Sequence, residues 1–60
     1  MRNPEHEKIV AATGCKYLGT SDGLVWFDAP SHSTLVVPEP QFSLEAVQQR
    51  LAEHALAMAA

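Results

Sequence analysis

The chain has few of the residues that would cross-link a small protein or attach it to a charged polymer. Its 60 residues include a single cysteine, Cys15, so no internal disulfide can form and the disulfide-rich secreted class is excluded. Only four residues are basic, and they are scattered singly, whereas binding to a phosphate backbone needs them gathered on one face. We therefore expect no nucleic-acid partner.

Long apolar runs are also missing. Met1 and Arg2 lead into a polar segment, so we expect no signal peptide. The unbroken apolar stretches, such as those at 24–27 and 35–38, are only a few residues long and far shorter than the ~18 residues of a membrane span. These features predict a cytoplasmic protein with no membrane partner.

What the chain does contain is the composition of a small, folded, acidic protein. The net charge is −3, and 47% of the residues are hydrophobic while 18% are charged, a balance typical of globular domains. A chain of this size buries only about 60% of the surface exposed in its unfolded form, which leaves room for one domain, residues 1–60. Because one cysteine excludes a disulfide, self-association is among the remaining ways to add stability.

The N-terminal segment predicts a short helix. Asn3 can cap it, Pro4 suits the first helical position, and Gly14 suits the left-handed residue that follows a helix end near Thr13. The helical period places four residues on the expected inner face: His6, Ile9, Val10 and Thr13.

The middle of the chain predicts three strands, at about 15–20, 24–28 and 34–37, since it is rich in β-branched and aromatic residues between turn residues. Asp22-Gly23 is a hairpin signal, the polar segment 28–33 predicts a surface loop, and Pro38 and Pro40 end the sheet. The order of these elements indicates an antiparallel meander.

Two registers fit the first hairpin. A two-residue type I′ turn pairs Gly19 with Trp26, Thr20 with Val25 and Leu18 with Phe27, and it places Tyr17, Leu24 and Trp26 on the face opposite Leu18, Val25 and Phe27. A three-residue turn with a bulge shifts the pairing by one residue, so that Leu18 faces Trp26. The sequence leaves both open.

The C-terminal segment predicts an amphipathic helix that begins after Ser43 as its N-cap, with Phe42 stapled onto Val47. We expect its apolar stripe to lie across one sheet face; the stripe contains Leu44, Val47, Leu51, Ala55 and Met58. The predicted fold is α+β, in the order α-β-β-β-α. The first helix and a partner are equal candidates to cover the other face of the sheet.

No residue pattern predicts catalysis or a cofactor. The histidines and Cys15 lack the paired short spacings of zinc sites, and no nucleophile signature surrounds Cys15. Asp28, Ser31 and His32 lie close in sequence, but a catalytic triad is defined by geometry. We expect no catalytic residue, no cofactor and no metal ligand.

The apolar surplus instead predicts a non-enzymatic protein-interaction module whose partner is another protein or a second copy of the chain, as in a homodimer. The candidate contact residues are Tyr17, Leu24, Trp26 and Leu56. One alternative is a small acidic inhibitor of a host protein, of the type that phages encode. Another is a small-ligand or metal binder that acts as an oligomer through Cys15, Asp28 and His32.

Overall fold

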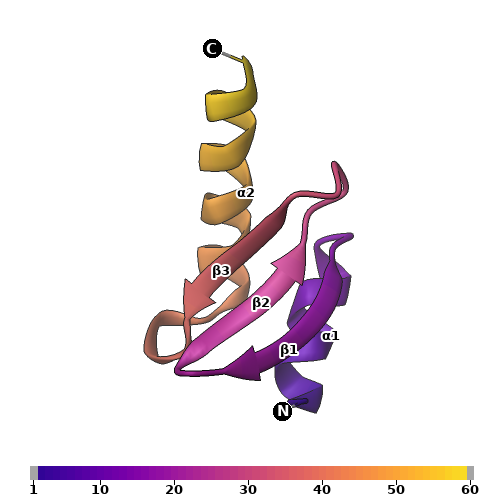
Figure 1. Cartoon of the computed structure of the whole chain (residues 1–60), viewed down its shortest axis with the longest axis vertical. Coiled ribbons are helices and arrows are strands. Elements are labelled where there is room, and N and C mark those ends of the chain that lie inside the picture. Colours follow the sequence, from indigo (N-terminus) through magenta and orange to yellow (C-terminus); the bar gives the residue numbers. More distant parts are fainter. Residues whose placement is uncertain (1, 60) are drawn as a thin grey trace.

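A computed structural model describes residues 2–59 and shows the predicted order of elements, with all strands in one antiparallel sheet of order β1-β2-β3 (Figure 1). The elements are α1 (Pro4–Ala12), β1 (Lys16–Ser21), β2 (Leu24–Asp28), β3 (Thr34–Pro38), a 3-10 turn (Glu39–Gln41) and α2 (Leu44–Ala59). The α+β fold expected from the sequence is confirmed. Within these residues, neither helix has the length and apolar character needed to cross a membrane.

The ends of α1 form where the local chemistry predicts them. The side chain of Asn3 accepts hydrogen bonds from the backbone N–H groups of Glu5 and His6, at 3.0 and 3.3 Å, and so satisfies two donors that a helix start leaves free. Gly14 follows the helix with φ +79°, a conformation that costs a residue with a Cβ about 1–2 kcal/mol. The chain then turns directly into β1.

The first hairpin has the two-residue turn. Asp22 and Gly23 both have positive φ, 53° and 73°, as a type I′ turn requires. The expected pairs of Gly19 with Trp26 and of Thr20 with Val25 are present. The glycine at position 23 therefore serves the turn.

The expected pair of Leu18 with Phe27 is wrong, because a β-bulge interrupts the ladder between Tyr17 and Gly19. Tyr17 pairs with Phe27 instead, and Leu18 becomes the extra residue opposite Trp26. Each side chain therefore changes face relative to the prediction. Tyr17 is 5% exposed and belongs to the core, whereas Leu18 is 43% exposed.

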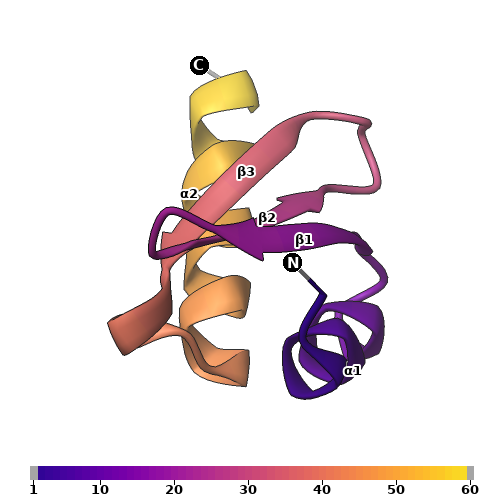
Figure 2. The same cartoon turned by 60° about the horizontal axis from the view of Figure 1, so that its bottom comes forward.

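Both helices lie on the same side of the sheet, which Figures 1 and 2 show from two directions. Helix α1 packs mainly against β1, and α2 packs mainly against β3. The core between helices and sheet consists of the buried residues Val10, Cys15, Tyr17, Val25, Phe27, Ala29, Leu35, Val37 and Val47. We call this side the inner face and the opposite side the outer face.

Hydrogen bonds and ring packing fix α1 to the sheet. The backbone N–H of Asn3 donates to the hydroxyl of Tyr17 at 2.9 Å, and Tyr17 and Thr20 share a hydroxyl hydrogen bond of 2.5 Å. Nδ1 of His6 lies 3.0 Å from the same Thr20 hydroxyl, and its ring is 4.5 Å from that of Phe42. These contacts hold Tyr17 on the inner face.

The predicted stripe of α2 is only partly buried. Ser43 caps the helix by accepting from the N–H of Ala46 at 3.1 Å, Val47 is fully buried, and Leu51 packs against the core. Leu44 is 43% exposed and Met58 is 66% exposed, so the expectation that the whole stripe lies on the sheet is wrong. The last turns of α2 extend past the end of the sheet (Figure 1).

Candidate functional site

The outer face of the sheet has no helix over it in residues 2–59. Paired residues on neighbouring strands point to the same side, and side chains alternate along each strand. The register therefore sets three rows on the outer face: Lys16, Asp28 and Thr34; Gly19, Trp26 and Val36; and Ser21, Leu24 and Pro38. Leu18, at the bulge, lies beside the middle row.

The middle of this face is apolar. Trp26 lies between Gly19 on β1 and Val36 on β3, and Leu18 and Leu24 flank it. Leu18 is exposed, and the other three apolar side chains are half-buried. A shallow hollow of about 230 Å³ opens here, and Leu18 and Trp26 contribute to its wall.

The indole N–H of Trp26 is buried and has no hydrogen-bond partner among the described residues. A buried donor without an acceptor costs about 1–3 kcal/mol, and Trp and Tyr usually satisfy theirs. The fold would meet the same packing needs with an apolar ring. The indole N–H of Trp26 therefore lowers the stability of the isolated domain.

The two charges of the outer face lie side by side at one end. Lys16 pairs with Asp28 across the ladder, and the hydroxyl of Thr34 donates to Asp28 at 2.9 Å. Among residues 2–59 the recorded salt bridge joins Arg2 to Glu7, so the ammonium of Lys16 has no carboxylate within bonding distance. The outer face thus has one charge of each sign and none in its apolar middle.

The predicted contact residues do not form one surface. Leu24 and Trp26 lie together on the outer face. Tyr17 lies on the inner face, for the reason given above, and its ring is 5.3 Å from the guanidinium of Arg2. Leu56 is 73% exposed and belongs to the part of α2 that extends past the end of the sheet (Figure 1).

Sequence reasoning did not name several residues of the outer face as contact residues, among them Lys16, Leu18 and Val36. Val36 could have been found, because alternation along a strand places it opposite Val37. Leu18 required knowledge of the bulge, which inserts one residue without a recognisable sequence signal. Lys16 becomes relevant only once the strand register places it beside Asp28.

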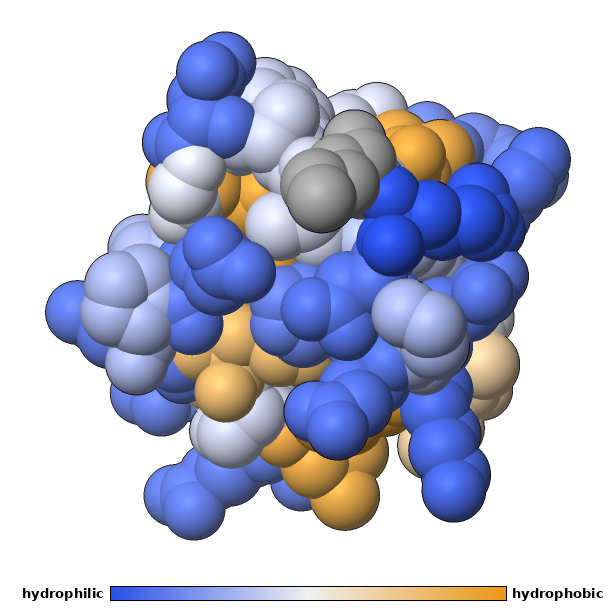
Figure 3. Space-filling model, turned by 90° about the horizontal axis from the view of Figure 1, so that it is seen from below, coloured by the Kyte–Doolittle hydropathy of each residue, from blue (hydrophilic) through white to orange (hydrophobic). Residues whose placement is uncertain are grey.

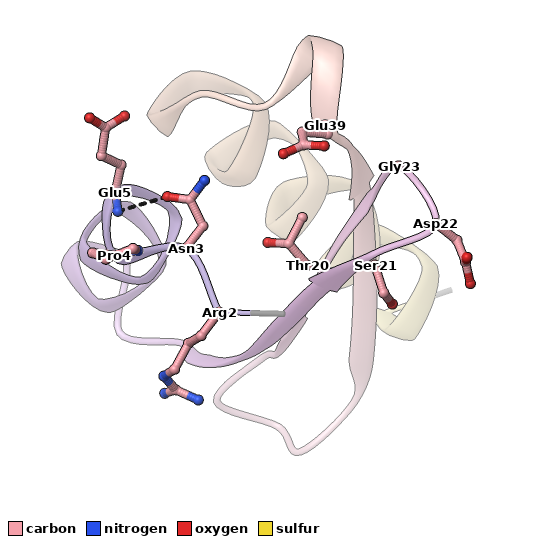
Figure 4. A pocket seen from close by; sticks show the side chains of 9 residues that line it. All are labelled: Arg2, Asn3, Pro4, Glu5, Thr20, Ser21, Asp22, Gly23 and Glu39. Atoms are coloured by element: carbon pink, nitrogen blue, oxygen red, sulfur yellow. Dashed lines mark hydrogen bonds between the residues drawn. The ribbon is translucent and has the colours of Figure 1, made fainter.

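An open cleft of about 820 Å³ lies between the start of α1 and the β1–β2 turn. In Figure 4 the side chains of Thr20 and Glu39 point toward the start of α1, while those of Asp22 and Arg2 point away. Its end of the molecule is largely hydrophilic, with apolar atoms in separate small areas (Figure 3). Arg2 is engaged by Glu7, whose hydrogen bond and negative charge raise the pKa of Arg2.

The residues considered for metal binding or catalysis are spread over the fold. Cys15 is buried, and Asp28 lies on the outer face. Ser31 is not joined to His32 or Asp28; its hydroxyl oxygen lies 3.5 Å from Nε2 of His54, longer than the ~2.6–3.2 Å expected of a nucleophile and its base. Within residues 2–59, no three His, Cys, Asp or Glu side chains gather as metal ligands would.

Comparison of the chain with protein-family models, with curated proteins and with solved structures gave no match.

Proposed function

We propose that this chain is a small protein-interaction module that acts without catalysing a reaction, and that the outer face of its sheet is the contact surface. The observation that carries the proposal is the placement of both helices on one side of the sheet. This placement leaves an aromatic residue with apolar neighbours on the other side. Apolar surface gathered in one place is typical of interaction sites on small domains.

The composition of the outer face supports a protein partner. Interface centres are rich in Trp and poor in charge, and a few aromatic anchors supply most of the binding free energy. Trp26 occupies the middle of the face, and the charged pair lies at its end. The unpaired indole N–H lowers the stability of the fold, which supports a role for Trp26 in binding.

Single substitutions to glutamate test the proposal. Trp26→Glu places a charge in the middle of the outer face, and Leu56→Glu makes a comparable change at an exposed apolar position of α2, away from that face. Tagged forms of the wild type and both variants are used as baits, against native cell extract and against an untagged copy of the chain. We expect a protein that binds the wild type and Leu56→Glu but not Trp26→Glu.

Equal recovery of every bound protein by all three baits would contradict the proposal. Circular dichroism of each variant must show the wild-type spectrum, so that lost binding is not caused by unfolding. Because Trp26→Glu can also destabilise the sheet, Leu24→Glu on the same face provides a second test.

A further inference from the structure

This inference rests on the proposed function and concerns the partner that binds the outer face. We infer that the occupant is a second copy of this chain, and that two copies pack outer face to outer face, with Lys16 of each beside Asp28 of the other. The inference depends on the charges of the face and on its symmetry.

The charge distribution favours self-association at this face over other parts of the surface. The chain has a net charge of −3, so two copies repel each other in general. Of its seven acidic residues, only Asp28 lies on the outer face, and Lys16 beside it balances that charge. Two outer faces can therefore approach each other without net repulsion.

The geometry is self-complementary. In a two-fold symmetric dimer, if residue i contacts residue j of the other copy, then j also contacts i. A two-fold axis that runs parallel to the strands, between β1 and β2, sets each residue of β1 above its own ladder partner in the other copy. Lys16 then faces Asp28 of the second copy twice, and Trp26 faces the bare backbone of Gly19.

Both charges are available for such contacts. Lys16 is exposed and has no ion-pair partner among the described residues. Asp28 accepts from Thr34 through Oδ1, which leaves lone pairs on its other oxygen. A carboxylate that is held in place by one hydrogen bond is well suited to accept another from an ammonium group.

The size of the face sets the expected affinity. Strands spaced ~4.8 Å apart, with a rise of ~3.3 Å per residue, make an outer face of about 14 by 17 Å. This is well below the ~800 Å² per partner of a standard stable interface. The dimer is therefore weak and in exchange with monomer, so the experiment must extend to high protein concentration.

The test is a charge exchange between copies, measured by sedimentation equilibrium over a wide concentration range. Lys16→Glu alone and Asp28→Lys alone each place like charges opposite each other, and each should weaken dimerisation at least about tenfold. An equimolar mixture of the two variants restores opposite charges at both contacts. We expect the mixture to form a mixed dimer with close to wild-type affinity.

Matched controls change the same charges elsewhere. Lys8→Glu on α1 and Glu53→Lys on α2 are exposed helix positions away from the outer face, and each should leave dimerisation within about twofold of wild type. Thermal unfolding of all variants checks that they are folded. Trp26 is the only tryptophan, so its fluorescence reports burial of the outer face as the concentration rises.

A wild-type chain that remains monomeric at every concentration would overturn the inference, as would a mixture that associates no better than either variant alone. The proposed function has a separate readout. If the chain is monomeric but a different protein binds the wild type and does not bind Trp26→Glu, the proposed function is supported and the partner is that other protein. If Trp26→Glu changes no binding of any kind, both proposals fail.

Discussion

The two faces of the sheet differ in their surroundings: the inner face is buried under helices, and the outer face is not. The inner face holds Tyr17, Val25, Phe27, Leu35 and Val37 under both helices, and all five are nearly or fully buried. The outer face has an equally apolar middle, yet no element of residues 2–59 covers it. The same strands thus provide both the core and an exposed apolar surface, so hydrophobicity alone does not tell which face is which.

The largest difference between the faces should appear when their central aromatic residues are removed. Phe27→Ala empties a fully buried position and should cost about 3–5 kcal/mol, enough to unfold a chain of this size. Trp26→Ala should cost about 1–2 kcal/mol, because its ring is already partly in water. Urea unfolding followed by circular dichroism measures both, and equal losses would remove the distinction between the faces.

The same contrast applies along α2. Val47→Ala removes fully buried methyl groups and should destabilise the fold by about 2 kcal/mol. Leu56→Ala changes a side chain that is 73% exposed and should alter the free energy of unfolding by less than about 0.5 kcal/mol. Denaturant midpoints at fixed protein concentration compare the two; a large loss for Leu56→Ala would show that the helix end has a contact within the monomer.

A smaller effect should follow from Tyr17→Phe, which keeps the ring on the inner face but removes its hydroxyl. The N–H of Asn3 loses its acceptor and Thr20 loses a hydrogen-bond partner, so we expect a loss of about 1 kcal/mol. Thermal unfolding provides the measurement. Unchanged stability would show that the link between α1 and β1 depends on packing alone.

A small effect on stability is also expected for Trp26→Phe on the outer face. The substitution removes the unpaired indole N–H, which offsets the loss of some apolar area, so the free energy of unfolding should change by less than about 1 kcal/mol. The proposed dimer should weaken in the same variant. A clear loss of stability with unchanged association would assign Trp26 to the fold and would count against its role in binding.

The parts of this structure that the sequence predicts are those with local causes. Asn3 caps α1, Asp22-Gly23 makes the turn, and Ser43 caps α2, because each feature depends on a few neighbouring atoms. The face that Tyr17 occupies depends in part on Asn3, whose N–H reaches the Tyr17 hydroxyl only after α1 has packed against β1. The bulge at Leu18, which moves Lys16 and Leu18 onto the outer face, is therefore not predictable from the local sequence pattern.

The side taken by α1 was open for a related reason. Val10 is apolar, but an apolar helix face fits either side of a sheet whose two faces are both apolar. Similarly, the helical period correctly groups Val47 with Met58, but it does not say where the sheet ends. Strands of five or six residues are about 17–20 Å long, whereas sixteen helical residues rise about 24 Å.

Because α2 is longer than the strands, its first and last turns are stabilised in different ways. Its first turns are held by burial of Val47 against the sheet, and should exchange their amide hydrogens only when the whole domain unfolds. The residues 52–58 that follow are mostly exposed, but they consist largely of alanine, leucine and methionine, which have high intrinsic helix propensities. There the helix persists by local preference, and its amides should exchange through fraying, far faster than those of the first turns.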